Sequence, residues 1–374
     1  MAEQHNRIVF TGDIAFSRYF KNAWKDNGCL SEGIMQYLDK ANYVVANVEC
    51  PLTTNQIKSK RPLNHMGDPH AGEYLRRMNI LNWTLANNHI MDCEADGLRD
   101  TLRCAEENGC QAIGAGENEA EASRPLILGD EVKVGILAVA GDWAHVKAGK
   151  DTPGALTIDK TDIIADAIRE LRKTVDWVVV AAHNGDEYTD LVLPYRREQY
   201  IKLLKLGADI VVGHHPHVVQ QYEYFGKKLI VYSLGNFIFD TEHQRNFKHT
   251  DTGMLIGIDF KKNGFTMDLY PTRINREEKR IEEGTIPAVF QNISDDEYSK
   301  LWPLAAYNLN IADMKNRKLL SKWKLYDYRI MMFMANVYKC RQKPYRSMQI
   351  GRFLSVFGQW KKTTLPDVVK YMRE

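Results

Sequence analysis

Three histidines stand within four residues of one another, directly after an apolar stretch. His214, His215 and His217 follow residues 209–212, in the order Gly-His-His-Pro-His. Each buried histidine needs hydrogen-bond partners, and three crowded imidazoles are hard to satisfy by packing alone. Neutral imidazole is also the most common metal ligand in proteins. We therefore interpret this segment as part of a metal site.

Polar side chains also follow four other apolar, strand-like stretches. These stretches cover residues 7–11, 43–46, 81–86 and 177–182, and the side chains after them are Asp13, Glu49, Asn88 with His89, and His183. In open α/β sheets, ligands bind in the crevice at the carboxyl ends of the strands. We therefore expect donors from five strands to converge in one place.

The donor set restricts the chemistry. Carboxylates, an amide oxygen and imidazoles, with no cysteine among them, suit Mn, Fe, Zn or Mg better than a soft metal. Six or seven donors are enough for two divalent ions, which together lower the pKa of a bridging water and stabilise both oxygens of a displacement. The chemistry expected from this set is hydrolysis, or a related transfer, of a phosphoester or an amide.

Seven ordered motifs extend this pattern over residues 7–270. They are Phe10-Thr-Gly-Asp-Ile-Ala-Phe-Ser-Arg18, Asn47-Val-Glu-Cys-Pro-Leu-Thr53, Leu85-Ala-Asn-Asn-His89 with Asp92 and Gly97, Gly114-Ala-Gly-Glu-Asn118, His183-Asn-Gly-Asp-Glu-Tyr188, Gly207-Ala-Asp-Ile-Val-Val-Gly-His-His-Pro-His217 and Tyr232-Ser-Leu-Gly-Asn-Phe-Ile-Phe239. In this order they resemble the CapA family, which is associated with synthesis of poly-γ-glutamate capsules and is similar to calcineurin-like metallophosphoesterases.

The resemblance implies a four-layer α/β/β/α sandwich with a dinuclear metal site. It assigns Asp13 and His217 to one ion, Glu49 to a bridge, and Asn88, His183 and His215 to the other ion. His89 would be the proton donor beside the leaving group, and Arg18 and Asn47 would contact an anionic substrate or steady the ligands. His214 is an alternative to His215 as a ligand, and otherwise a candidate substrate contact.

The chain departs from the implied pattern in two places. Metallophosphoesterases usually carry Asp-x-His at the first strand, where this chain has Asp13-Ile14-Ala15. The family commonly has His-Trp-Gly where this chain has His183-Asn184-Gly185. The first departure removes a ligand, so we expect one of the two ions to be held weakly or to be absent.

The distribution of apolar residues supports an α/β fold. Helix-like spacing covers residues 33–41, 93–108, 161–175 and 196–206, between the strand-like stretches. A hairpin is predicted for residues 254–270 as the last pair of strands, and the charged stretch 275–284 is read as a surface connection. We expect one domain over residues 1–285 and a helical extension over residues 286–374, beginning at the capping sequence Ser294-Asp-Asp-Glu297.

Charge is unevenly distributed along the chain. The formal net charge is only +2, which gives no reason to expect a nucleic acid partner. From residue 313 onward, however, 15 basic and 4 acidic side chains interleave with apolar ones. This extension either packs its apolar side on the main domain, which we favour, or docks on a membrane surface, an anionic polymer or an acidic protein. The first residues lack the pattern of a secretory signal, so we expect a cytoplasmic protein.

Three functions remain open at this stage. The first is a metal-dependent hydrolase or transferase that acts on a phosphoester or an acidic amide-linked polymer. The second is a component that binds an anionic surface polymer, or organises its assembly, without turnover. The third is a small-molecule phosphatase or nucleotidase. Fold resemblance alone does not fix the substrate.

Overall fold

A computed structural model describes residues 6–25, 28–55, 64–302 and 305, which belong to one compact unit. The basic stretch from residue 313 onward lies outside the described residues, so the extension and its partners stay predictions. Residues 295–302 are helical, and Ser294 and Glu297 cap this segment reciprocally as expected. Tyr298 is buried and its hydroxyl donates to the carbonyl of Val192, which anchors the segment to the main domain.

The first large sheet has seven strands in the order β17-β16-β15-β1-β3-β4-β5. The strands are β1 (Asn6–Phe10), β3 (Tyr43–Asn47), β4 (Asn82–Thr84), β5 (Gln111–Ile113), β15 (Thr252–Lys261), β16 (Gly264–Asn275) and β17 (Arg280–Glu283). Strands β1, β3, β4 and β5 are parallel, whereas β15, β16 and β17 extend the sheet with antiparallel neighbours. The parallel half brings three of the predicted ligand-bearing strand ends together.

The second large sheet has six strands in the order β12-β13-β11-β10-β8-β7. The strands are β7 (Leu126–Leu128), β8 (Val134–Ala140), β10 (Trp177–His183), β11 (Ile210–His214), β12 (Tyr222–Phe225) and β13 (Lys228–Val231). The four central strands are parallel. Two small sheets pair β2 (Asp13–Ile14) with β14 (Asn236–Ile238), and β6 (Ala115–Gly116) with β9 (Gly154–Ala155).

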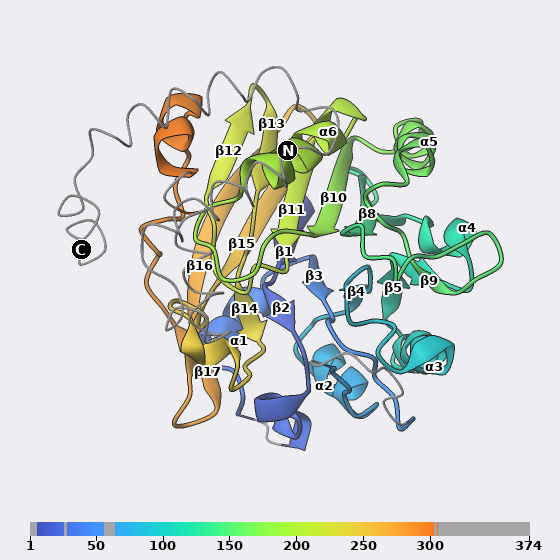
Figure 1. Ribbon diagram of the computed structural model, residues 1–374, viewed down its shortest axis with the longest axis vertical. Helices are drawn as coiled ribbons and strands as arrows, with labels where there is room; N and C mark the ends of the chain where they lie inside the picture. The colour runs from blue at the N-terminus through green and yellow to red at the C-terminus, as the bar shows by residue number, and fades with distance from the viewer. Residues whose placement is uncertain (1–5, 26–27, 56–63, 303–304, 306–374) are drawn as a thin grey trace, which may run out of the picture. The chain divides into compact units, whose positions relative to one another are not determined.

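The two large sheets pack against each other and helices cover their outer faces (Figure 1). Val179 and Ala181 of β10 point into the core shared with the seven-stranded sheet, while Val178 and Val180 point into a second core beneath α5 and α6. This alternation is what a strand covered on both faces requires. The predicted α/β/β/α order is therefore confirmed.

The helices agree with the predicted positions to within a few residues, and two were not predicted. They are α1 (Glu32–Asp39), α2 (Ala71–Arg77), α3 (Glu94–Glu107), α4 (Glu119–Ala122), α5 (Thr161–Leu171) and α6 (Pro194–Lys205), with short 3-10 turns η1 (Arg18–Phe20), η2 (Ala23–Lys25) and η3 (Gln244–Asn246). Helices α2 and α4 are the unpredicted ones. Gly109 and Gly207 follow α3 and α6 with positive φ, as a C-terminal glycine should.

The interpretation of residues 275–284 as a surface connection was wrong in part. The predicted hairpin forms β15 and β16, but β17 then adds a third antiparallel strand, with Ile281 opposite Ile274. Ile281 is fully buried and also bridges to Leu30. One apolar residue among charged neighbours is enough to anchor β17, because β17 is the edge strand of the sheet. One of its faces and its outer edge are exposed to water.

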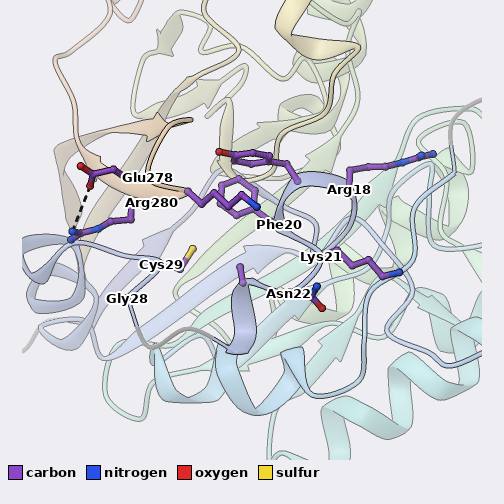
Figure 2. A pocket seen from close by; sticks show the side chains of 11 residues that line it. Arg18, Phe20, Lys21, Asn22, Gly28, Cys29, Glu278 and Arg280 are labelled. Atoms are coloured by element: carbon purple, nitrogen blue, oxygen red, sulfur yellow. Dashed lines mark ion pairs between the residues drawn. The ribbon is translucent and has the colours of Figure 1, made fainter.

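A cavity of about 430 Å³ lies beside this edge, between η1–η2 and the turn before β17 (Figure 2). Its lining comes from parts of the chain that are far apart in the sequence, residues 18–23 with 28 and 29, and residues 278–280. In the part of the chain that the structure describes, no helix is both long and apolar enough to cross a membrane.

Candidate metal centre

The predicted ligands meet where five strands end. Asp13, Glu49 and Asn88 follow β1, β3 and β4 of one sheet, whereas His183 and His215 lie at or just beyond the ends of β10 and β11 of the other sheet. All five are at least nine-tenths buried. The convergence expected from the strand ends is thus present in the structure, and it lies between two sheets rather than at the edge of one.

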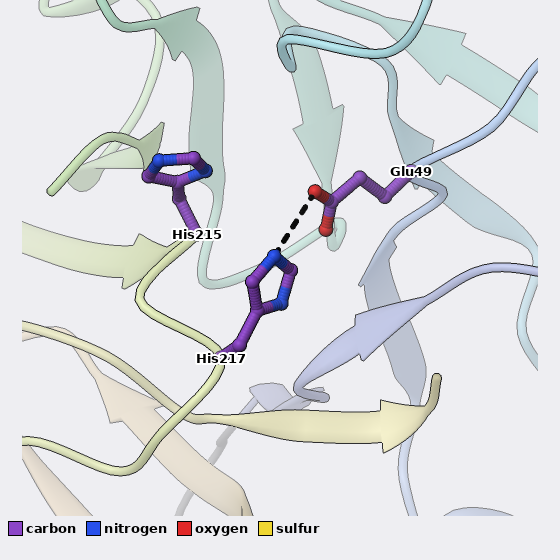
Figure 3. Close-up of side chains that lie close together, drawn as sticks. All are labelled: Glu49, His215 and His217. Carbon is purple, nitrogen blue, oxygen red and sulfur yellow. Dashed lines mark ion pairs between the residues drawn. The ribbon is translucent and has the colours of Figure 1, made fainter. Parts of the chain in front are cut away.

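Glu49 is the centre of this arrangement. Its Oε1 atom is 3.4 Å from Nε2 of His183 and 3.7 Å from Nε2 of His217. Figure 3 shows the Glu49 carboxylate directed at the ring of His217. The ring of His215 lies across the site from Glu49. One ligand atom from each of Glu49, His215 and His217 can be chosen so that all lie within 4.8 Å, and the same holds for Asp13, Glu49 and His183.

Asn47 connects the carboxylates to the imidazole of His183. Its Nδ2 atom is 2.8 Å from Oδ1 of Asp13 and 3.0 Å from Nδ1 of His183. The opposite nitrogen of His183, Nε2, is 2.8 Å from Oδ1 of Asn88. Asn47 therefore links Asp13 to His183, and its role in steadying metal ligands stays a prediction.

The backbone of the histidine segment is held in an uncommon conformation. His215 and His217 have φ of 97° and 58°, in the region that bulky residues seldom occupy. The backbone N–H of His215 donates to Oδ2 of Asp13 at 3.1 Å, and Nδ1 of His217 is 3.0 Å from Oδ1 of Asn236. Backbone strain of this kind costs about 1–3 kcal/mol and is typical of functional sites, where surrounding contacts hold it in place.

Burial shifts the protonation of the imidazoles in the direction that suits metal binding, and that of the carboxyl groups in the opposite direction. Loss of water raises the pKa of Asp13 to about 7, against hydrogen bonds from Asn47 and His215 that lower it, and holds the pKa of Glu49 well above its usual value. The same desolvation lowers the pKa of His217 to about 4 and holds the pKa of His183 and His215 well below the usual value. The imidazoles are therefore neutral and can donate a lone pair to a cation.

Two buried atoms show that the donor set fits a cation. Oε1 of Glu49 and Nδ1 of His215 are buried without a hydrogen-bond partner among the described residues. Neither Asp13 nor Glu49 pairs with a lysine or arginine in the described part of the chain. Buried carboxylates need a compensating positive charge, and a divalent ion bound by both carboxylates and the neutral histidines supplies one.

The two possible donor groups are Glu49 with His215 and His217, and Asp13 with Glu49 and His183. Both contain Glu49, as expected of a carboxylate that bridges two ions. They place His183 with Asp13 and His215 with His217, whereas the resemblance pairs Asp13 with His217 and His183 with His215. The number of ions and the division of ligands between them therefore stay predictions.

The predicted proton donor lies in a network beside these ligands. Nδ1 of His89 is 2.7 Å from Oδ2 of Asp92, and the backbone N–H of His65 donates to the same oxygen at 2.7 Å. Oγ of Ser17 is 2.6 Å from Nδ1 of His65. The sequence analysis missed His65 and Ser17, because neither follows a predicted strand.

Trp143 and Asn87 were also missed. The Trp143 ring packs on His215 and His183, with centroids 4.7 Å and 5.9 Å apart. Asn87 donates to the carbonyl of Val48 at 2.8 Å and so fixes the turn that carries Glu49. Trp143 follows the end of β8, but a search for Asp, Glu, Asn or His after strands does not find a tryptophan.

Two predicted substrate contacts lie outside the donor groups. Nε2 of His214 is 2.9 Å from the carbonyl oxygen of Thr11, which ties β11 to the loop after β1. Arg18 is exposed, lines the cavity beside η1, and donates to the carbonyl of Asn64 at 3.1 Å. Contact of Arg18, Asn47 or His214 with a substrate stays a prediction.

Comparison with known proteins adds sequence relatives. A family model described as bacterial capsule synthesis protein PGA_cap matches residues 7–241. The PGA biosynthesis protein CapA of Bacillus subtilis (strain 168) is 32% identical over 266 residues, or 68% of each protein. The capsule biosynthesis protein CapA of Bacillus anthracis is 28% identical over 280 residues, covering 71% of this chain and 67% of that protein.

Solved structures resemble the chain more distantly. A hypothetical protein from Thermus thermophilus aligns with a TM-score of 0.44 at 13% identity, over 71% of this chain and 98% of the other. The 5'-nucleotidase from Candida albicans SC5314 aligns with a TM-score of 0.42 at 9% identity, over 86% of this chain and 60% of the other. Similarity at this level says nothing about chemistry.

Proposed function

Because the chain belongs to the family of bacterial capsule synthesis proteins, we propose that it acts in the synthesis of a capsule or poly-γ-glutamate as a metal-dependent hydrolase or transferase. The reaction would take place at the donors Asp13, Glu49, Asn88, His183, His215 and His217. The scissile bond is a phosphoester or an amide of an acidic polymer.

One observation supports this proposal above the others. The unpartnered Oε1 of Glu49 lies among buried, neutral imidazoles, an arrangement that is costly unless a cation completes it. A bound divalent ion would polarise the bond to be broken and lower the pKa of a water molecule. Asn47 holds Asp13 and His183 in the positions that such an ion needs, because its amide donates to one and lies against the other.

His89 has the surroundings of a proton donor. Asp92 accepts a hydrogen bond from Nδ1 of His89, which fixes the ring and leaves the transferable proton on Nε2. The carboxylate also stabilises the imidazolium that carries both protons. We assign His89 the protonation of the leaving group, and Asp92 the orientation of His89.

The first test is elemental analysis of protein purified without chelator, as metal per chain, with hydrolysis of phosphodiesters and γ-glutamyl amides measured in parallel. We expect wild type to hold a divalent metal, and His217→Ala to lose both the metal and the activity. His70→Ala is the matched control, since the His70 side chain is 69% exposed and pairs with Asp68 on the surface. Metal content and activity that survive in His217→Ala would refute the proposal.

A non-catalytic role in binding or assembly is the second candidate, and the structure offers one observation in its favour. Ala15 is fully buried where the metallophosphoesterase pattern carries a ligating histidine. A site short of one ligand could keep its ion without turning over substrate. Hydrolysis that depends on both metal and His89, with either class of substrate, would exclude this role.

A further inference from the structure

Four of the eleven residues that line the cavity beside η1 are cations. Arg18, Lys21, Lys279 and Arg280 contribute positive charges, and Glu278 is the single acidic side chain in the lining. Figure 2 shows Arg18 and Lys21 extending in the same direction on one side, with Arg280 and Glu278 on the opposite side. The cavity thus has positive charges on both sides of a space of about 430 Å³, within the usual range for a ligand site.

Most of this charge is not neutralised by the protein. Glu278 lies 3.9 Å from Arg280, but no described carboxylate forms an ion pair with Arg18, Lys21 or Lys279. The ammonium of Lys279 instead lies 5.1 Å from the centre of the Tyr19 ring. Like charges around a hollow repel one another, so their accumulation favours an anionic occupant.

Two of the cations also have strained backbones. Arg18 has φ of 50° and Lys279 has φ of 54°, both in the left-handed region. Neither residue is glycine, asparagine or aspartate, which accept this conformation most readily. Strain on both sides of one cavity is consistent with side chains that are held in place for a ligand.

A short series of contacts leads from the cavity to the predicted proton donor. Arg18 donates to the carbonyl of Asn64, and the preceding Ser17 hydrogen bonds to the ring of His65. The His65 ring meets that of His89 edge to face, with centroids 4.3 Å apart. Ser17 and His65 thus link Arg18 in the cavity lining to His89.

From these observations we infer that the cavity is a subsite for the carboxylates of an acidic amide-linked polymer, held while a neighbouring bond lies at the metal centre. Separate cations on two sides suit a chain with one negative charge per repeat, and the partly buried ring of Tyr19 suits its aliphatic segments. This inference rests on the proposed function, because it names the substrate class of the same site.

Binding of a fluorescein-labelled γ-linked oligoglutamate to the full-length, metal-loaded protein tests the inference by anisotropy. Lys21→Glu with Lys279→Glu should weaken binding by about tenfold or more, because two charge-assisted contacts become repulsive. The control is Lys150→Glu with Lys227→Glu, which changes the charge equally at two exposed positions outside the cavity. Melting temperature and metal per chain must match wild type in both variants.

The outcomes separate this inference from the proposed function. Equal weakening in the control variant, or unchanged binding in the cavity variant, would overturn the subsite. Equal competition by inorganic polyphosphate would overturn the assignment to carboxylates, while failure of the same γ-linked oligomer with its α-carboxylates converted to neutral amides to compete would support it. Anisotropy requires no turnover, so a selective loss of binding would stand even if the metal and hydrolysis measurements refuted the proposed reaction.

Discussion

The ring of His65 meets the ring of His89 edge to face, with 4.3 Å between their centroids, and both residues donate to the same oxygen of Asp92. Asp92 is fully buried. One carboxylate thus fixes the position of the loop that carries His65 and the orientation of the His89 ring. The contact between His65 and His89 therefore joins residues of two separate loops at the proposed proton donor.

Asp92→Asn should lower kcat by about 100-fold, because general acid catalysis contributes roughly two to four orders of magnitude and needs the ring correctly held. An asparagine of the same shape can present its N–H to Nδ1 and so favour the wrong tautomer. Steady-state kinetics together with metal per chain would check this, since the metal content should stay at the wild-type value. Asp96→Asn, at an exposed side chain in the same helix as Arg99, is the control. An unchanged kcat would remove Asp92 from the mechanism.

His214 and His215 are neighbours with different partners, which gives a second prediction. His215→Ala should abolish metal loading, because Nδ1 of His215 is buried among the donors without another partner in the described residues. His214→Ala should keep the metal but lower the free energy of unfolding by about 1–3 kcal/mol, since the carbonyl of Thr11 loses a buried hydrogen bond. Elemental analysis and urea unfolding of both variants would decide. Loss of metal in His214→Ala would show that His214 is a ligand.

A substitution of Asn47 tests how the carboxylates of Asp13 and Glu49 are held apart. In Asn47→Asp a third carboxylate stands beside Asp13 and Glu49 and can no longer donate to Asp13. We expect a melting temperature below that of wild type in chelator, with a smaller difference when divalent metal is present, because the ion offsets the added charge. Scanning calorimetry with and without metal would measure this. A difference that does not depend on metal would contradict the proposed role of the cluster.

Strand ends made most of the site predictable from sequence. Apolar runs of strand length followed by Asp, Glu, Asn or His can be recognised locally, and the carboxyl ends of parallel strands share an edge of the sheet. His65 could not be found in this way, since its contact with His89 spans a loop of no regular pattern. Strand β17 was not predicted for a related reason, because only its pairing with β16 makes Ile281 a core residue.

The roles within the site depended on tertiary contacts as well. His214 and His215 are equivalent by spacing, and only the direction of each side chain separates a hydrogen bond to Thr11 from a place among the donors. A strand alternates its side chains between two faces, so neighbouring histidines must diverge. Which of the two histidines joins the donors is set by the packing of β11 against the seven-stranded sheet, and a one-residue error of register would reverse the assignment.

The far side of the seven-stranded sheet gives a prediction about pH. Burial raises the pKa of Asp268, but hydrogen bonds from Arg7 and Tyr37 outweigh burial and hold it below the usual value. A lowered folded-state pKa stabilises the fold above the unfolded pKa of about 3.9, and this contribution is lost as the pH falls through the folded value.

Asp268→Asn should therefore melt about 1–2 °C below wild type at neutral pH, a small effect because the Asp268 side chain is 46% exposed. The difference should shrink when the pH falls below about 4, where the wild-type carboxylate also takes up a proton. Thermal unfolding followed by fluorescence over this pH range would measure it, with Asp39→Asn, at the exposed end of α1, as the control. A difference that persists undiminished at acid pH would contradict a role of the negative charge of Asp268 in stability.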